Sequence, residues 1–248
     1  MNQFFVQKGM IETLSRCQKE FEKNLKNKKI MFIYENKNRS IDKEEMLFPI
    51  SCFYHLTGIK AFDKDNKPLN SYSFYNLLKT NRIDEMKLKF KDTTTYYKLE
   101  ILPQLMRIDR TAKMIGDFCG NNVYLQTSKV TGNINACMGF IKDNEYSNVY
   151  VPNTALKEDI RKVVDNKAKI IAILKKDMTN NLYANITYLK QDYEIKDILK
   201  NQEITKNIDV NNIYSADRIV DKKIYEYYYE LENNNERNIE DLDITDNF

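Results

Sequence analysis

The apolar side chains in the first part of the chain follow helical spacing and then strand spacing. Residues 4–27 carry apolar side chains near every third or fourth position, which predicts an amphipathic helix (Phe5, Ile11, Leu14, Phe21 and Leu25). The apolar run at 29–35 predicts a strand, and a second strand is expected over 40–48, ended by Pro49. Residues 50–58 predict a short helix that stops at its glycine.

The next segment is polar and then helical in pattern. Residues 61–70 predict a loop, because they are polar and contain a proline. Two short helices are expected, at 71–80 and 83–90. Three threonines at 93–95 can cap a longer helix that runs to about residue 118 and bends near Pro103.

Short segments rich in aromatic and β-branched residues dominate the chain after residue 120. They predict strands at 123–129, 135–142, 148–151, 169–176 and 183–189, with a helix over 152–164. Because helices come mostly before strands, the order predicts an α+β fold in which N-terminal helices pack on a C-terminal antiparallel sheet. The domain spans 1–195, a helical extension spans 196–232 with its helix at 217–231, and an acidic disordered tail spans 233–248.

Several classes of function lack their sequence signatures. The chain has only 6 glycines and neither of the glycine-rich loops that bind dinucleotides or nucleoside triphosphates. Its 4 cysteines form no CxxC pair, and it has 1 histidine, so we expect no metal and no cofactor. Neither a signal peptide nor an apolar run long enough for a membrane span is evident. We therefore expect a cytoplasmic protein that does not contact a membrane.

The charge is divided unevenly along the chain. Residues 224–248 contain eight acidic residues and one basic residue, whereas the rest of the chain has 38 basic and 28 acidic residues, a net charge of +10. A basic body of this kind suits a polyanionic partner such as RNA. The alternative is a solvated, lysine-rich surface without a partner.

One histidine carries the sharpest chemical signal in the sequence. The segment Phe53-Tyr54-His55-Leu56-Thr57-Gly58 places it among apolar neighbours. Histidine exchanges protons near neutral pH without a large pKa shift, which favours acid–base catalysis. The alternative is a core histidine whose ring nitrogen bonds to a backbone carbonyl.

The same segment carries a resemblance to a known group of proteins. An aromatic-x-His-Leu-Thr-Gly segment after a helix, a strand pair and a polar turn resembles the phage families of nucleases related to barnase, EndoU, colicin nucleases and RelE, most of all the fourth such family. The later segments that share it are Met138-Gly139-Phe140, Val149 to Thr154, Ile170 to Lys176 and Tyr183 to Thr187. The resemblance spans about residues 10–192 and leaves out the acidic C-terminal region.

The resemblance implies an α+β domain whose exposed sheet face binds RNA and cleaves it without metal. It implies a catalytic set of His55, Lys176 and Thr187, and substrate contacts from Thr57, Lys60, Thr154, Lys175 and Tyr183. Strand alternation further predicts that Tyr183, Asn185 and Thr187 face outward together. One feature departs from many such ribonucleases: no second histidine exists to share the proton transfers.

Three hypotheses follow from the sequence. The first is a phage-type RNA-binding protein that cuts RNA such as tRNA through His55. The second is a non-catalytic phage accessory protein that binds and inhibits a bacterial defence or regulatory protein, with the acidic tail imitating nucleic acid. The third is a phage scaffolding protein that forms a large homo-oligomer.

Overall fold

The computed structural model of the protein describes residues 3–120, 126–143 and 149–215. Its helices are α1 (Gln3–Asn24), α2 (Ile50–Thr57), α3 (Ser71–Lys79), the 3₁₀ helix η1 (Ile83–Glu85), α4 (Thr95–Leu105), α5 (Ile108–Thr111), α6 (Ile160–Val163), α7 (Ile195–Leu199) and α8 (Gln202–Thr205). Its strands are β1 (Lys28–Glu35), β2 (Ile41–Leu47), β3 (Ile59–Phe62), β4 (Lys87–Phe90), β5 (Met114–Phe118), β6 (Lys129–Gly132), β7 (Cys137–Asp143), β8 (Val149–Leu156), β9 (Val164–Asp177), β10 (Asn185–Leu189) and β11 (Tyr214–Ser215).

Nine strands form one large, mixed sheet, in the order β1-β2-β8-β7-β6-β5-β9-β10-β11. A further pairing between β1 and β9 closes the first seven into a barrel-like ring, from which β10 and β11 extend. The pairs β2–β8 and β10–β11 are parallel and the other pairs are antiparallel. The α+β class holds, but the sheet is not purely antiparallel, and its strands come from both the N-terminal and the later part of the chain.

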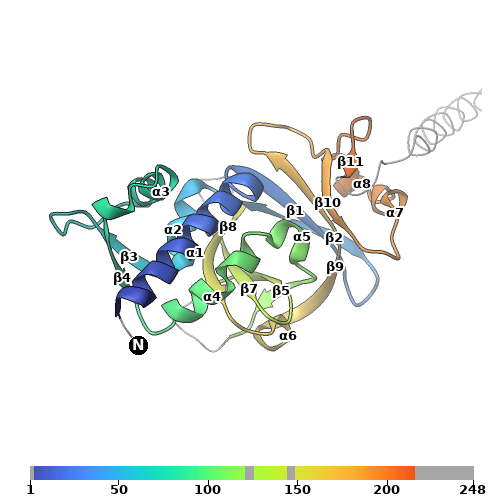
Figure 1. Ribbon diagram of the computed structural model, residues 1–248. Coiled ribbons are helices and arrows are strands. Elements are labelled where there is room, and N and C mark those ends of the chain that lie inside the picture. The colour runs from blue at the N-terminus through green and yellow to red at the C-terminus, as the bar shows by residue number, and fades with distance from the viewer. Residues whose placement is uncertain (1–2, 121–125, 144–148, 216–248) are drawn as a thin grey trace, which may run out of the picture.

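Alternate residues of β1 pack against helices that lie on its two sides. Ile30 and Phe32 join a core cluster with residues of α1 to α5, whereas Met31 and Ile33 join a second cluster with residues of α7 and α8. α1 contributes Leu14, Cys17, Phe21 and Leu25, which are fully buried and share one helical face. Figure 1 shows α1, α4 and α5 lying across one side of the sheet.

Several elements differ from those that the sequence pattern predicts. Residues 83–90, expected as a helix, form η1 and then β4, which pairs with β3 in a separate two-stranded sheet. The long helix expected over 93–118 ends at Leu105, and Met114–Phe118 is a strand between β6 and β9. Of residues 152–164, expected as a helix, 152–156 complete strand β8, and only the short α6 is helical before β9. In each case pairing with distant strands outweighs local helical spacing.

The helix expected at 217–231 and the acidic segment 224–248 lie outside the described residues. Within the described part of the chain, no helix combines the length and the apolar character needed to cross a membrane.

Candidate functional site

The corner where α2 meets β3 carries His55. α2 ends at Thr57, and Gly58 takes the left-handed backbone conformation (φ 66°) that turns the chain into β3. A Cβ atom on Gly58 would lie 3.0 Å from Lys98 Cδ and 3.2 Å from Thr95 Oγ1, so the glycine also permits α4 to approach closely. This turn fixes the last turn of α2, and with it His55, against the start of α4.

His55 is exposed to solvent in that last turn. Partial burial of the ring lowers its pKa below the ordinary 6.5, and the nearby positive charge of Lys91 lowers it further. The imidazole is therefore mostly neutral at pH 7 and available to accept a proton. The alternative of a core histidine with a satisfied ring nitrogen does not describe this side chain.

The outer side of the β3–β4 sheet is lined with lysines beside His55. Lys60 lies directly opposite Lys89, and Phe62 lies opposite Lys87. Because side chains alternate along a strand, these four residues share one face, and Lys91 follows at the next outward position. We call Lys60, Lys87, Lys89 and Lys91 the lysine face.

The lysines of the lysine face form no ion pairs among the described residues, although the charge of Lys91 helps to lower the pKa of the neighbouring Asp92. All four lysines are exposed, and none takes part in an ion pair found in that part of the chain. Lys87 Nζ donates instead to two neutral oxygens, Lys64 O and Asn66 Oδ1, both at 2.9 Å. Since like charges directly opposite each other in a sheet are destabilising, the Lys60–Lys89 pair favours a bound anion.

A further lysine, Lys98, lies in the first turns of α4 against Gly58. It is half-buried, and burial lowers its pKa; the charge of Lys91 acts in the same direction and that of Asp92 opposes it. Asp92 itself accepts a hydrogen bond from the Thr94 backbone at 2.8 Å. Lys98 is therefore an ammonium group that loses its proton more readily than an ordinary lysine.

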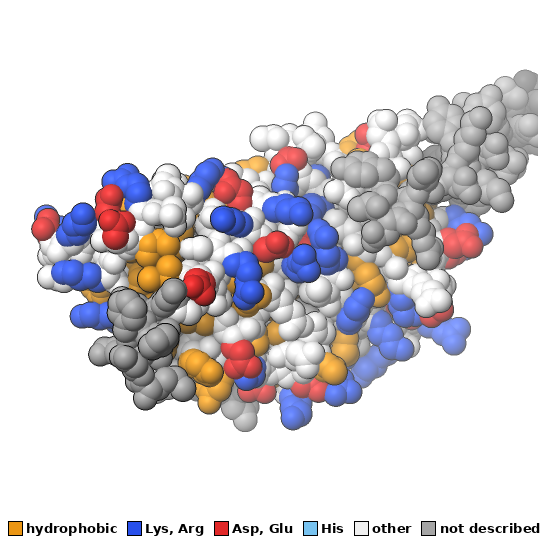
Figure 2. Space-filling model, in the orientation of Figure 1, with side chains coloured by type: hydrophobic (Ala, Val, Ile, Leu, Met, Phe, Trp, Pro, Cys, Tyr) orange, Lys and Arg blue, Asp and Glu red, His pale blue; other side chains and the backbone are white. Residues whose placement is uncertain are grey.

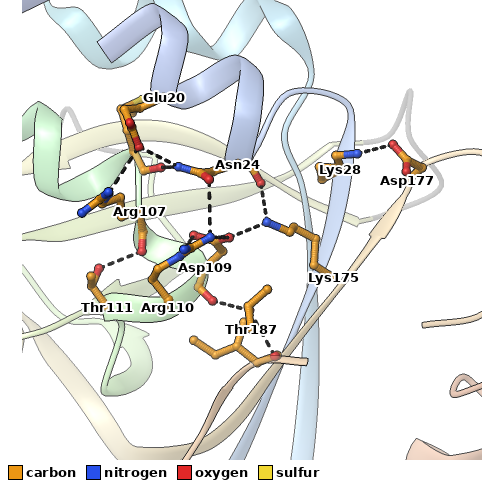
Figure 3. A network of polar contacts seen from close by, with 12 residues as sticks. Glu20, Asn24, Lys28, Arg107, Asp109, Arg110, Thr111, Lys175, Asp177 and Thr187 are labelled. Atoms are coloured by element: carbon orange, nitrogen blue, oxygen red, sulfur yellow. Dashed lines mark hydrogen bonds and ion pairs between the residues drawn. The ribbon is translucent and has the colours of Figure 1, made fainter. Parts of the chain in front are cut away.

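A second polar region surrounds Asp109 of α5, as Figure 3 shows. Lys175 Nζ lies 2.6 Å from Asp109 Oδ2 and donates to Asn24 O at 3.1 Å. The Asp109 side chain is fully buried and that of Lys175 is 10% exposed. Thr187 Oγ1 donates to the backbone oxygen of Asp109 and, at 3.2 Å, to that of Ile173. The two predicted site residues Lys175 and Thr187 thus meet at Asp109, Lys175 at its buried carboxylate and Thr187 at its backbone oxygen.

Arginines form the outer edge of this Asp109 network. Arg110 Nη2 lies 3.3 Å from Asp109 Oδ2 and 3.4 Å from Asn24 Oδ1. Arg107 Nε lies 3.3 Å from Glu20 Oε2, which also accepts from Asn24 Nδ2 at 3.1 Å. Figure 2 shows Lys and Arg side chains interspersed with acidic ones on this face of the molecule. The cations of the Asp109 network are held by carboxylates, in contrast to those of the lysine face.

Lys176 and Tyr183 meet on the other side of the sheet. Lys176 Nζ lies 4.3 Å from the centre of the Tyr183 ring and donates to Asn181 O at 2.6 Å. Tyr183 is fully buried, and its hydroxyl donates to Glu45 Oε2 at 3.2 Å. The prediction that Tyr183 faces solvent beside Thr187 is wrong, because the chain around Ile208 pairs with it and covers it.

The other two predicted threonines, Thr57 and Thr154, also lie apart. Thr57 is buried; its hydroxyl donates to Tyr54 O at 2.7 Å and accepts from the Ile59 backbone at 3.2 Å, which shapes the end of α2. Thr154 is buried on β8 beside Gly139. The sequence-predicted residues therefore fall into separate groups: His55, Thr57 and Lys60 at the α2–β3 corner, Lys175 and Thr187 at Asp109, Lys176 with Tyr183, and Thr154 alone.

Sequence reasoning missed Lys89, Lys91 and Lys98. The signal was present as the alternating Lys87-Leu88-Lys89-Phe90, which is a strand pattern, but it was assigned to a helix. As for metals, the described His, Cys, Asp and Glu side chains nowhere form a group of three able to hold an ion.

The comparisons with known proteins identify a family. No curated protein and no solved structure matches the chain. A family model described as phage-Barnase-EndoU-ColicinE5/D-RelE like nuclease 4 matches residues 13–192, which include α2, the lysine face, the Asp109 network and β9 and β10. The chain belongs to this family of phage nuclease-like proteins.

Proposed function

We propose that this protein binds RNA on the lysine face and cleaves it, without a metal ion, through His55. The observation that carries the proposal is an exposed histidine, with its pKa lowered, beside Lys91 at one end of a face of four exposed lysines that form no ion pairs among the described residues. Membership of a nuclease-like family supports a nucleic-acid substrate. Lysines without carboxylate neighbours are suited to contact phosphates, each contact releasing counterions from the polyanion.

The proposed reaction uses the RNA's own nucleophile. The neutral His55 ring accepts the proton of a 2′-hydroxyl, whose oxygen then attacks the adjacent phosphorus. The bond from phosphorus to the 5′-oxygen of the next nucleotide breaks, which leaves a 2′,3′-cyclic phosphate and a 5′-hydroxyl. Lys60 and Lys91 are placed in this scheme as point cations that stabilise the charge on the phosphorane oxygens.

The leaving 5′-oxygen requires a proton, and the chain has no second histidine to supply it. We assign this role to Lys98, since its lowered pKa makes its ammonium a better acid than that of an ordinary lysine. Lys98 lies against Gly58, and Gly58 follows His55 by three residues in the sequence. Of the residues expected from sequence, His55 and Lys60 stay in this proposal. Lys175, Lys176, Thr187, Thr57, Thr154 and Tyr183 serve local contacts in the structure instead.

A cleavage assay tests the proposal. Total RNA and purified tRNA are incubated with the wild-type protein and with the His55→Ala variant in EDTA, and the 3′ ends of the products are analysed. We expect cyclic-phosphate products from the wild type and a loss of at least about 100-fold in rate in the variant, the contribution typical of general acid–base catalysis. An RNA with a single 2′-deoxy substitution at the cleavage position should resist both proteins.

The outcomes separate binding from catalysis. A Lys37→Gln variant provides the control for charge change, because Lys37 is exposed in the turn between β1 and β2. A variant with Gln at Lys60, Lys89 and Lys91 should bind RNA more weakly than this control. If the His55→Ala variant cleaves as fast as the wild type, His55 is not the proton acceptor. If the wild type neither cleaves nor binds RNA, the proposal fails as a whole.

A further inference from the structure

Two neighbouring tyrosines in the first turn of α4 are unusually exposed. Tyr96 is 62% and Tyr97 is 53% exposed, whereas Thr95, Leu99 and Leu102 of the same helix are buried. The buried face of α4 packs on α1 and α2. The two rings are therefore not stabilised by packing in the core. Large aromatic side chains that neighbour each other in solvent commonly mark a binding surface.

The tyrosine pair lies at the corner that carries His55. Residues on both sides of the pair contact the cap of the His55 helix: Thr95 Oγ1 donates to Gly58 O at 2.6 Å, and Lys98 Cδ lies 3.0 Å from where a Cβ atom on Gly58 would be. Lys91 N also donates to Gly58 O, at 3.0 Å. The cap of the His55 helix, the end of the lysine face and the first turn of α4 thus meet at one glycine, and the two tyrosines project from the other side of that turn.

The pair has the geometry of a preformed aromatic platform. The ring centres are 5.9 Å apart and the ring planes meet at 77°, an edge-to-face contact. Lys157 Nζ lies 5.3 Å from the centre of the Tyr97 ring and is held there by both carboxylate oxygens of Glu100, each at 2.6 Å. Tyr97 is supported from one side, while Tyr96 remains the more exposed ring.

We propose that Tyr96 and Tyr97 stack against unpaired bases and so select single-stranded RNA as the substrate. The proposal rests on the RNA-binding function argued above. Bases in a duplex already stack on one another, so aromatic side chains reach them only in single-stranded segments. Lysines two residues apart along β4 lie about 6.6 Å from each other, on the order of the step between successive phosphates of an extended strand. Phosphates then follow the lysine face while bases meet the tyrosines.

Binding measured by fluorescence anisotropy tests this assignment. The probes are a labelled, unstructured oligoribonucleotide and the duplex that it forms with its complement. Because stacking contributes about 1–3 kcal/mol per base, the double variant Tyr96→Ala, Tyr97→Ala should bind the single strand at least about 10-fold more weakly. Its affinity for the duplex should stay within about two-fold. The double variant Tyr96→Phe, Tyr97→Phe keeps both rings and should bind like the wild type.

Matched variants make each outcome informative. Tyr72→Ala removes a side chain of similar exposure (57%) on α3 and should leave both affinities unchanged. Equal loss of single-strand and duplex affinity in the tyrosine variant, or no loss at all, overturns the stacking proposal while RNA binding stands. Absence of RNA binding in the wild type overturns the proposed function and this inference together. Circular dichroism verifies that each variant is folded.

Discussion

The molecule has two groups of cations that differ in almost every physical respect. The Asp109 network encloses Lys175 in the core, within bonding distance of a buried carboxylate and a backbone oxygen. The lysine face holds Lys60 and Lys89 in solvent, opposite each other and without an ion-pair partner among the described residues. A buried charge must be paired to be tolerated, whereas an exposed one can remain unpaired until a ligand arrives.

This difference separates the group that holds the fold together from the group to which the proposed function assigns RNA binding. The contacts of the Asp109 network join α1, α5, β9 and β10, segments that are far apart in the sequence. Removing any of them is expected to loosen the packing of the helices on the sheet. The lysine face makes only local contacts, such as those of Lys87 with Lys64 and Asn66, and the repulsion between Lys60 and Lys89 destabilises the free protein. Free energies of unfolding, measured for variants in each region, therefore test this distinction.

The largest effect is expected from Asp109→Leu. Lys175 would keep its charge in the core without its carboxylate, and breaking a buried pair in this way typically costs about 3–5 kcal/mol in the free energy of unfolding. The measurement is urea unfolding followed by circular dichroism. Adding Lys175→Met removes the stranded charge, so the double variant should recover most of the lost stability.

An exposed pair provides the control for that experiment. Arg82 and Glu85 form a salt bridge with the arginine side chain 59% exposed, and Arg82→Ala should cost far less stability than Asp109→Leu. If Asp109→Leu costs no more than this control, the buried pair does not stabilise the fold. The contrast between the two regions would then lose its energetic basis.

The amphipathic segments of the fold could be read from the sequence because their pattern and packing agree. α1, β1, β2 and α2 fall within a few residues of the predicted segments. The elements that could not be predicted depend on distant partners: Met114–Phe118 is a strand only because β6 and β9 flank it. β4 likewise needs β3, with which all four of its residues pair.

The candidate site was predictable only in part for the same reason. His55 stands out in the sequence as the single histidine, and Lys60 lies five residues away. Lys89, Lys91 and Lys98 reach the same corner only through the pairing of β3 with β4 and the approach of α4 to Gly58. Tyr183 shows the opposite error, since strand parity alone gives no warning that the segment around Ile208 covers it.

A smaller effect is expected on the pH dependence of His55. Its pKa lies below 6.5 in the folded protein, so the folded state takes up a proton less readily than the unfolded chain. The contribution of His55 to the free energy of unfolding is fully present above pH 6.5. It is lost as the pH falls from 6.5 to the pKa of the folded state. If cleavage requires neutral His55, the pH–rate profile should have an acidic limb, and the midpoint of that limb should lie below pH 6.5. Removing one nearby charge with Lys91→Gln should move that limb upward, by less than about one pH unit.

A pH profile of kcat/KM, measured with RNA far below saturation so that it reports the free protein, and an NMR titration of the single histidine check this prediction independently of each other. Lys37→Gln again serves as the charge-matched control and should leave the limb in place. A titration midpoint above 6.5 in the wild type would contradict the electrostatic role assigned to Lys91. A limb that moves without the NMR midpoint would show that another group, and not His55, controls the rate.

The smallest effect on stability, and the sharpest contrast in function, is expected from Lys89→Glu. An opposite-charge pair across neighbouring strands contributes about 0.2–1 kcal/mol, so a glutamate opposite Lys60 should raise the free energy of unfolding. The same change removes one cation and adds one anion on the lysine face, so RNA affinity should fall and its salt dependence should become less steep. Lys89→Gln should lie between the wild type and Lys89→Glu in both measurements. A variant that is more stable and binds RNA more weakly would mean that the wild-type lysine serves a ligand and destabilises the free protein. A gain in stability with unchanged RNA affinity would place the RNA elsewhere.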